Sequence, residues 1–248
     1  MAVIAGNWKM HMGPAETSAF FEGFDVGDVG SGHELLIFPP AVSLGAAASA
    51  PARDPRVQLG VQNLYWEDQG AFTGETSAPM AAAAGATHAL IGHSERRHVF
   101  GETDDETARK VEAAHRAGLT PVLCVGEKLD ERRADRVEEV ILRQLDAALG
   151  PLSSPGRRFL VAYEPVWAIG TGETATPDDA SAAHETLRRR LEEALGVAEA
   201  ARVPILYGGS VKPGNASELL AASDVDGVLV GGASLDPDSF ARIASAGG

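Results

Sequence analysis

The sequence of 248 residues is poor in cysteine and in positive charge. Its one cysteine, Cys124, excludes an internal disulfide framework and fits a reducing compartment, so we expect a cytoplasmic protein. The 21 Lys and Arg residues are outnumbered by 35 Asp and Glu residues, which gives a formal net charge of −14. No basic footprint for nucleic acid is therefore visible. An anionic ligand is still possible, because salt screens distant charges beyond about 8 Å and the local groups decide.

Long hydrophobic runs, targeting signals and metal-binding patterns are also missing. No apolar run reaches about 18 residues, so we expect no membrane span. The first ten residues, MAVIAGNWKM, contain neither a basic n-region nor a long apolar h-region, so no signal peptide is visible. The seven histidines show no HxH or HExxH spacing, and the single cysteine has no partner. These patterns argue against a metal site.

Eight short apolar runs recur along the chain and indicate the fold class. Their continuous rather than alternating apolar character is typical of parallel strands that are buried on both faces. Dividing 248 residues among eight strand-plus-helix units gives 31 residues each, which suits a (β/α)₈ barrel. The runs are residues 2–6, 34–40, 57–62, 88–93, 121–126, 159–164, 203–209 and 226–232.

We therefore predict an α/β protein in which residues 1–248 form a single (β/α)₈ barrel with a closed parallel sheet. The length alone would also allow two small domains, but no linker is visible. The alternative fold is an open doubly wound sheet. Such a sheet usually carries GxGxxG after its first strand, where this chain has GNWKM.

Two of the intervening segments have clear helix signals. Residues 103–118 begin at Thr103, a candidate cap, continue with acidic residues and stop at Gly118. Residues 176–196 begin at Thr176, place a proline in the first turn and stop at Gly196. Both segments are predicted to be helices of the barrel's outer layer.

Polar residues and glycines gather at the predicted carboxyl ends of the strands, where barrel enzymes carry their chemistry. Each of them alone could be a surface side chain or part of a turn. Together, on one rim, they predict an active site. They are Asn7, Lys9, His93, Ser94, Glu95, Glu164, Gly208, Gly209, Ser210, Gly231 and Gly232.

The segment AYEPVWAIGTG (162–172) places Glu164 after an apolar run and before a proline, followed by two large apolar residues and small ones. Three explanations are open from the residues alone: a surface carboxylate before an ordinary loop, a metal ligand, or a catalytic base beneath a lid. The glycine-rich ends of the last two strands are candidates for phosphate binding through backbone N–H groups. The candidates are Gly209, Ser210, Gly231 and Gly232, with Gly170 reaching in from the segment after Glu164.

The sequence resembles the triosephosphate isomerase family along its whole length. The resemblance is carried by GNWKM (6–10), QNLYWEDQGAFTGETSAPM (62–80), IGHSERR (91–97), PVLCVGE (121–127), AYEPVWAIGTG (162–172), YGGSV (207–211) and DGVLVGGASL (226–235). It implies a barrel enzyme that interconverts dihydroxyacetone phosphate and D-glyceraldehyde 3-phosphate in glycolysis and gluconeogenesis. The reaction is a proton transfer through an enediolate and requires no cofactor or metal.

The resemblance also implies roles for individual residues. Glu164 would be the base and His93 a neutral electrophile, with residues 94–101 forming a short helix behind it. Asn7 and Lys9 would contact the substrate, and Glu95 would be a supporting carboxylate. Asn7, Lys9, Gly170, Ser210, Gly231 and Gly232 would bind substrate or phosphate, and a lid would comprise Pro165, Val166, Trp167, Ala168, Ile169, Gly170, Thr171 and Gly172.

Two structural expectations follow from the same resemblance. The long connection 64–79 carries three aromatic residues, and it is either a self-packed loop or a plug into a second identical subunit. The family favours the plug, with Thr73 near Lys9 and Glu95 of the partner subunit, in an isologous homodimer. The family also pairs Asp226 with an arginine of the helix after the sixth strand, here Arg188.

The chain departs from the family at two places. Glu173 stands where the family usually has lysine after the GTG of the lid, which concerns lid motion rather than chemistry. Residues 133–135, Arg-Ala-Asp, replace the family's usual acid-and-glycine ending, and we expect a surface helix to start there.

Two other functions are compatible with a barrel of this kind. One is a barrel aldolase that works through a lysine Schiff base, but the sixth strand has no lysine. The other is a non-catalytic barrel, which would tolerate the loss of Lys9, His93 or Glu164, yet all three are present.

Overall fold

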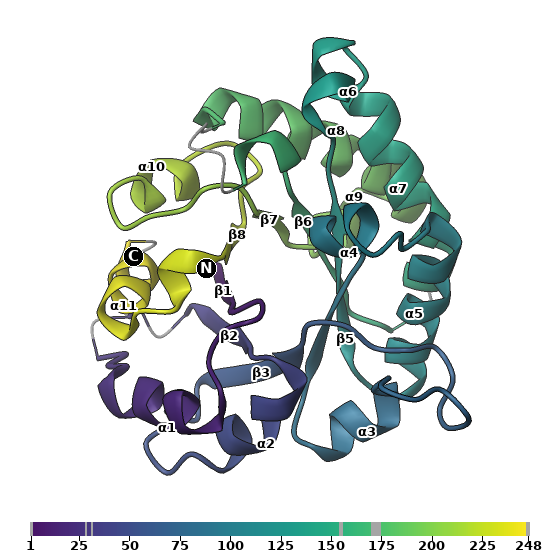
Figure 1. The fold of residues 1–248 in the computed structure, drawn as a ribbon. Helices are drawn as coiled ribbons and strands as arrows, with labels where there is room; N and C mark the ends of the chain where they lie inside the picture. Colours follow the sequence, from purple (N-terminus) through teal and green to yellow (C-terminus); the bar gives the residue numbers. More distant parts are fainter. Residues whose placement is uncertain (1, 28, 31, 154–155, 170–174, 247–248) are drawn as a thin grey trace.

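The computed structural model describes residues 2–27, 29–30, 32–153, 156–169 and 175–246. Eight parallel strands form a closed barrel in sequence order, with β8 pairing back onto β1 (Figure 1). The prediction of a (β/α)₈ barrel is confirmed, and the open doubly wound sheet is excluded. The strands are β1 (Val3–Asn7), β2 (Glu34–Phe38), β3 (Val57–Val61), β4 (His88–Ile91), β5 (Thr120–Val125), β6 (Leu160–Tyr163), β7 (Ile205–Tyr207) and β8 (Gly227–Val230).

Helices surround this barrel (Figure 1). Those that follow β1 to β4 are α1 (Pro14–Gly23), α2 (Ala41–Ser49), α3 (Ala78–Ala83), α4 (Ser94–His98) and α5 (Asp104–Arg116). Those that follow β5 and β6 are α6 (Leu129–Arg133), α7 (Val137–Leu152), the 3₁₀ turn η1 (Val166–Ala168), α8 (Pro177–Leu195) and α9 (Val197–Ala200). The last are α10 (Ala216–Leu220), η2 (Gly232–Ser234) and α11 (Pro237–Ser245). Within the described residues, no helix has the length and apolar character needed to cross a membrane.

The two helices predicted in detail begin and end as expected. Thr103 caps α5 and accepts a hydrogen bond from the amide of Glu106, while Gly118 adopts a φ of 76° just after the helix. Thr176 caps α8 in the same way through the amide of Asp179, and Gly196 at φ 83° ends it. Both glycines occupy the left-handed region, which L-residues with a Cβ rarely adopt.

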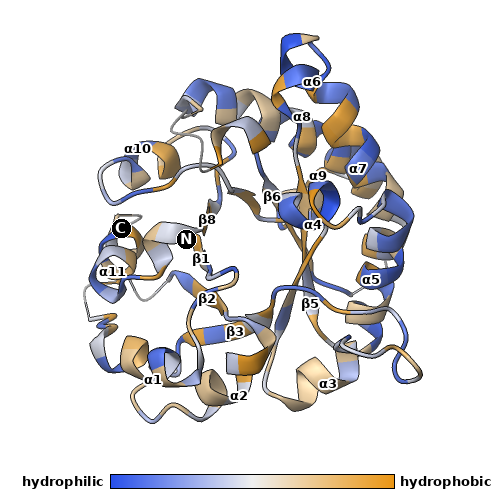
Figure 2. Cartoon of the chain, viewed as in Figure 1, coloured by the Kyte–Doolittle hydropathy of each residue, from blue (hydrophilic) through white to orange (hydrophobic). Residues whose placement is uncertain are grey.

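The apolar core has two layers, one inside the barrel and one between strands and helices. Side chains that alternate along each strand fill the barrel, among them Val3, Leu36, Phe38 and Leu160. Their neighbours face the helices and form the larger cluster. Both faces of the strands are therefore buried, which explains the continuous apolar runs in the sequence. Hydrophilic residues dominate short surface helices such as α4 (Figure 2).

The predicted ion pair between Arg188 and Asp226 is confirmed. The Nη2 atom of Arg188 on α8 lies 2.6 Å from Oδ2 of Asp226, which immediately precedes β8. The same oxygen accepts a hydrogen bond of 2.9 Å from the amide of Ile205, the first residue of β7. The pair therefore ties α8 to the starts of the last two strands.

The expectation of a helix start at residues 133–135 is wrong. Arg133 is the last residue of α6, and Asp135 has a φ of 56° in the turn before α7 begins at Val137. The left-handed backbone of Asp135 interrupts the helical conformation, so that α6 and α7 are separate helices. Aspartate tolerates that conformation better than most residues that carry a Cβ.

The long connection 64–79 is partly packed on itself and partly exposed. The rings of Tyr65 and Trp66 stack with centroids 4.0 Å apart, and Phe72 lies 4.5 Å from Tyr65. The guanidinium of Arg109 on α5 covers Trp66 at 4.1 Å. Thr73, at the tip, is exposed. The contact of Thr73 with a second subunit stays a prediction.

Candidate active site

A pocket of about 260 Å³ opens among the loops that follow the carboxyl ends of the strands. It collects predicted site residues that are far apart in the sequence, and it includes Ile169 from the segment after Glu164. Gly170, Thr171 and Gly172, which were predicted for the lid and the phosphate site, lie outside the described residues. The lining residues are Asn7, Lys9, His93, Glu164, Ile169, Gly208, Gly209, Ser210, Val211, Lys212, Leu229, Gly231, Gly232 and Ala233.

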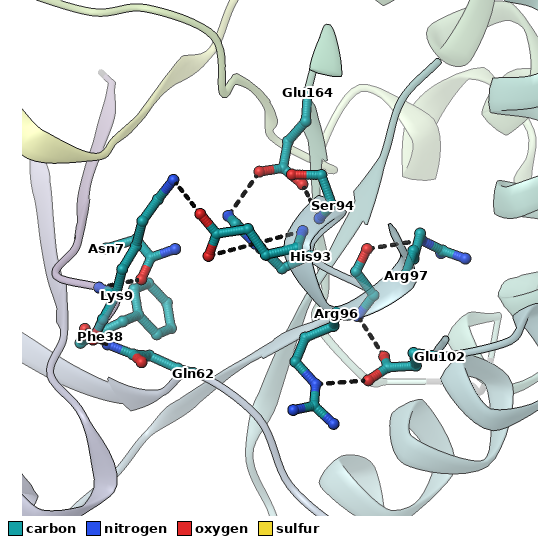
Figure 3. Close-up of polar contacts among 12 residues, drawn as sticks. Asn7, Lys9, Phe38, Gln62, His93, Ser94, Arg96, Arg97, Glu102 and Glu164 are labelled. Carbon is teal, nitrogen blue, oxygen red and sulfur yellow. Dashed lines mark hydrogen bonds and ion pairs between the residues drawn. The ribbon is translucent and has the colours of Figure 1, made fainter. Parts of the chain in front are cut away.

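The backbone at Lys9 is held in an unusual conformation by its neighbours. Lys9 has a φ of 51°, in the left-handed region that residues with a Cβ seldom occupy. Its amide donates to Oδ1 of the buried Asn7 at 3.0 Å. The side-chain amide of Gln62 donates to the carbonyl oxygens of Lys9 and Phe38, both at 2.8 Å. These three hydrogen bonds, drawn in Figure 3, fix the direction of the Lys9 side chain.

The ammonium group of Lys9 projects into the pocket and meets a carboxylate. Its Nζ atom lies 2.7 Å from Oε1 of Glu95, whose side chain is 46% exposed. Glu95 does not line the pocket but contacts both Lys9 and His93, with Oε2 lying 3.8 Å from Nδ1 of His93. The supporting position predicted for Glu95 is therefore consistent with its contacts.

Glu164 and His93 face each other across the pocket floor (Figure 3). The Oε1 atom of Glu164 lies 2.9 Å from Nε2 of His93, and both side chains are buried. The other oxygen, Oε2, accepts a hydrogen bond of 2.8 Å from the amide of Ser94, at the start of α4. Glu164 follows β6 and His93 caps α4, so the barrel brings together residues 71 positions apart (164 − 93).

The hydrogen bonds of His93 identify its tautomer. Its Nδ1 atom accepts from the amide of Glu95 at 3.3 Å, which requires Nδ1 without a proton and leaves Nε2 as the donor to Glu164. Burial lowers the pKa of His93, but the adjacent carboxylate of Glu164 outweighs it and holds that pKa above its ordinary value.

The carboxylate of Glu164 is ionised despite its burial. Burial raises the pKa of Glu164, but the contact with His93, the Ser94 amide and the charge of Lys9 together hold that pKa below its ordinary value. An ionised carboxylate with little water around it can accept a proton as soon as a carbon acid replaces its present partners. The site can therefore perform general base chemistry at neutral pH.

Glycines at the ends of β7 and β8 let the backbone approach the site closely. A Cβ atom on Gly208 would lie 2.9 Å from Cγ of Glu164, and one on Gly209 would lie 2.2 Å from the hydroxyl oxygen of Tyr207. A side chain at either position would displace these neighbours. Gly232 has no atom within 4 Å of such a Cβ, so its backbone borders open space in the pocket.

The sequence profile of the triosephosphate isomerase family matches residues 2–247. The chain belongs to the triosephosphate isomerase family. Among its relatives, the triosephosphate isomerase of Solibacter usitatus is 49% identical over 243 residues, covering 97% of each chain. Those of Alkalilimnicola ehrlichii and Halorhodospira halophila are also 49% identical, over 98% of this chain and 97% of theirs.

Three contributions to this site were not predicted from the sequence: the side chains of Gln62 and Glu127, and the backbone amide of Ser94, which was predicted only as a residue of the rim. Gln62 acts through two distant carbonyl oxygens, and Ser94 through its backbone amide, which no side-chain pattern reveals. The third is Glu127, a buried carboxylate after β5 that accepts hydrogen bonds from Tyr163 at 3.1 Å and Trp167 at 2.7 Å. Burial raises the pKa of Glu127 more than these contacts lower it. A charged residue at a strand end was the one available signal for Glu127.

The described residues contain no group of three or more His, Cys, Asp or Glu side chains that could hold a metal ion. The family's reaction moves a proton between two carbons and can be served by a carboxylate, an imidazole and a lysine. That no metal or cofactor takes part remains a prediction from the sequence.

Proposed function

We propose that this chain interconverts dihydroxyacetone phosphate and D-glyceraldehyde 3-phosphate in glycolysis, with Glu164 as the base. The observation that carries the proposal is the contact of a buried carboxylate with Nε2 of His93 at 2.9 Å, in a pocket that Lys9 also enters. Family membership supplies the substrate and the reaction. The side chains supply a base, a neutral hydrogen-bond donor and a positive charge.

The proposed reaction begins when substrate separates Glu164 from His93. The freed carboxylate removes a proton from the hydroxymethyl carbon beside the ketone, and the electron pair of that C–H bond forms the enediolate. The Nε2–H group of His93 stabilises the oxygen where negative charge develops, and a donor of this kind contributes about 2.7–4 kcal/mol. Glu164 then returns the proton to the neighbouring carbon. The hydroxyl proton on the first carbon passes to the former ketone oxygen, so that the first carbon becomes the aldehyde and the second carries the hydroxyl group.

Lys9 would contribute a fixed positive charge in an acidic protein. Its ammonium is already oriented by the backbone hydrogen bonds at Asn7 and Gln62, so little entropy is lost when substrate binds. Phosphate would be bound by the backbone around Ser210, Gly231 and Gly232, as in other barrels. Residues 165–172 would cover the site and exclude water, with Gly170 donating to phosphate.

A coupled isomerase assay tests the proposal directly. The purified chain should convert dihydroxyacetone phosphate without added metal, and Glu164→Gln should lose activity while retaining its fold. Borohydride trapping with the same substrate tests the aldolase alternative, because a Schiff base on lysine would be reduced to a stable adduct. An active, chelator-resistant enzyme with no adduct supports the proposal. An inactive chain, or a trapped lysine, would refute it.

The finer assignments belong to the same proposal. We infer that residues 1–248 act as one catalytic domain in the cytoplasm and serve gluconeogenesis as well as glycolysis. We also infer an isologous homodimer in which Thr73 inserts beside Lys9 and Glu95 of the partner subunit. In this proposal the loop would enter a hollow of about 380 Å³ that is lined in part by Met10 and Met12, which follow Lys9 in the sequence, and by Val42.

A further inference from the structure

Arg132, near the end of α6, bridges two segments that precede and follow residues 170–174. Its guanidinium contacts Trp167 in η1, Glu127 after β5 and Asp179 in the first turn of α8. The side chain is 29% exposed, so it lies at the border of the protein rather than in its core. Of these three contact residues, only Trp167 is among the site residues predicted from the sequence.

The first set of contacts holds η1. The guanidinium carbon of Arg132 lies 4.4 Å from the centroid of the Trp167 ring, and Nη1 lies 3.7 Å from Oε1 of Glu127. The same oxygen accepts the indole N–H of Trp167 at 2.7 Å. Arginine thus covers the face of the indole while Glu127 binds its edge, a pairing of cation and ring that fixes the ring's orientation.

The second contact holds the start of α8. The Nη2 atom of Arg132 lies 2.5 Å from Oδ1 of Asp179. The other oxygen of Asp179 accepts from the amide and the hydroxyl of Thr176, at 2.9 and 2.8 Å. Asp179 is therefore shared between the cap of α8 and Arg132, which couples the first turn of that helix to η1.

The position of η1 matters for the active site. Val166 donates its amide to the carbonyl of Glu127 at 3.1 Å, and Ile169, at the end of η1, lines the pocket that contains Glu164. Only Pro165 separates Glu164 from η1. A change in the orientation of Trp167 would therefore move both the apolar wall at Ile169 and the backbone that carries the base.

We propose that Arg132 is a positioning residue for the isomerase reaction, which aligns η1 with α8 by binding Trp167 and Asp179 at once. The inference rests on the proposed function, because it concerns the same pocket. Lysine cannot replace Arg132 fully, since only a planar guanidinium stacks on a ring while its edges bind two carboxylates. Arg132 does not touch the reacting atoms and is not a catalytic residue.

The chemistry of the intermediate provides a readout that a purely structural role would not change. An enediolate phosphate can be reprotonated, or it can expel phosphate. In the second case the C–O bond breaks, the phosphate oxygen keeps the electron pair, and the enol left behind tautomerises to methylglyoxal. A pocket whose apolar wall and base are misaligned should release more phosphate for each isomerisation.

The experiment compares Arg132→Met, Arg132→Lys and Asp179→Asn with the intact chain. Arg136→Met is the matched control, because it removes the same charge from the neighbouring turn, where Arg136 forms a 2.6 Å ion pair with the exposed Glu139. For each variant, kcat, KM, phosphate released per isomerisation and thermal unfolding are measured. Asp179→Asn keeps an oxygen for capping α8 and removes the charge that faces Arg132.

We expect Arg132→Met to lower kcat and raise the phosphate ratio, each by about tenfold, as estimated from the loss of a stacked cation and an ion pair. Arg132→Lys and Asp179→Asn should also lower kcat and raise the phosphate ratio, but by smaller factors. Arg136→Met should match the intact chain in both quantities. The double variant Arg132→Met/Asp179→Asn should lower kcat by a smaller factor than the product of the factors of the two single variants, because the two side chains act together.

The inference would be overturned if Arg132→Met lowered only the unfolding temperature and left the phosphate ratio unchanged. Should Arg132→Met fail to fold, Asp179→Asn decides: an unchanged ratio in that variant also overturns the inference. Failure of the proposed function itself is recognised separately, because the intact chain would then lack isomerase activity.

Discussion

The carboxylate of Glu164 combines burial, which opposes its charge, with three partners that favour it. Two of these partners, His93 and the Ser94 amide, occupy the two oxygens at 2.9 and 2.8 Å. Substrate has to displace at least one of them before Glu164 can reach a carbon. The position of this ionised base therefore depends on the length of its side chain.

Glu164→Asp tests that dependence. The shorter side chain keeps the charge but retracts the carboxylate by about 1 Å, and misplacement on that scale can cost about 10²-fold in rate. We expect kcat to fall by that order with little change in KM, because a base acts mainly in the transition state. Steady-state kinetics of the variant and the intact chain give both kcat and KM. A variant with nearly full kcat would remove Glu164 from the role of base.

His93→Gln should have two effects. Loss of the imidazole donor should lower kcat by about 10²- to 10³-fold, the usual cost of removing a preorganised donor to a developing oxyanion. It also removes the partner that lowers the pKa of Glu164, while the burial that raises it remains. The pKa of Glu164 should therefore rise in the variant.

The pH profile of kcat/KM checks the second effect, since it reports groups of the free enzyme. Because the reactive form of Glu164 is the carboxylate, activity is lost as the pH falls through its pKa. The acid limb caused by Glu164 should lie at higher pH in His93→Gln than in the intact chain, whereas ionisation of the substrate is common to both. An unmoved limb would contradict the coupling of the two side chains.

Among the elements, β2, β4 and β6 are linked at the end of the barrel opposite the pocket by one carboxylate. Glu34 opens β2 and pairs with Arg158 just before β6, through contacts of 2.9 and 2.5 Å. It also lies 3.4 Å from Nε2 of His88, the first residue of β4. Burial raises the pKa of Glu34, but His88 and Arg158 outweigh it and lower that pKa to about 2.

Glu34→Gln should reduce stability in a pH-dependent way. A lowered pKa in the folded state contributes stability that is present above the unfolded value of 4.5 and is lost as the pH falls toward about 2. Allowing for partial exposure, we expect the variant to lose about 1 to 2 kcal/mol of unfolding free energy near neutral pH. Urea unfolding at neutral pH and at about pH 3 should show the difference narrowing with acid. Glu22→Gln, at an exposed position, is the control; an equal loss at both pH values would contradict this account.

On the scale of the whole molecule, large apolar side chains remain exposed on the surface that includes the loops after β1 and β4. Met10 is 93% exposed, Val99 71% and Phe100 67%. Such side chains in a protein with a net charge of −14 are typical of a surface that is covered by a partner. The proposed homodimer would cover them.

Light scattering should give a mass of about twice 25.8 kDa for the intact chain. Thr73→Arg places a charge at the tip of the exposed loop and should produce monomers with reduced activity, because Lys9 would lose a neighbour that orders it. Ser217→Arg, at an exposed position of α10, should remain dimeric and active. A fully active monomer of the intact chain would refute the proposed assembly.

Much of the fold could be predicted because its signals are local. Continuous apolar runs indicate strands buried on both faces, and Thr103, Thr176 and the glycines at 118 and 196 mark helix ends. Polar residues after β1, β4, β6 and β7 could also be assigned to one rim, since parallel strands of a barrel all end on the same side. The pairing of Arg188 with Asp226 was predictable only from the resemblance to a family.

The helix start predicted at residues 133–135 is wrong, because local composition does not always distinguish the start of a helix from its end. The charged composition of α6 and of the turn after it is equally compatible with a helix start and a helix end. The left-handed backbone of Asp135 decides between them, and composition does not report it.

The other features of the site depend on contacts between segments that are far apart in the sequence. Gln62 fixes Lys9 through carbonyl oxygens, and Ser94 fixes Glu164 through an amide, so the identities of these partners carry no signal. Arg132 meets Trp167 and Asp179 only because α6, η1 and α8 lie side by side in the folded barrel. Periodicity and turn chemistry act over a few residues and are therefore written in the sequence, whereas the geometry of backbone donors and charged partners exists only once the barrel has closed.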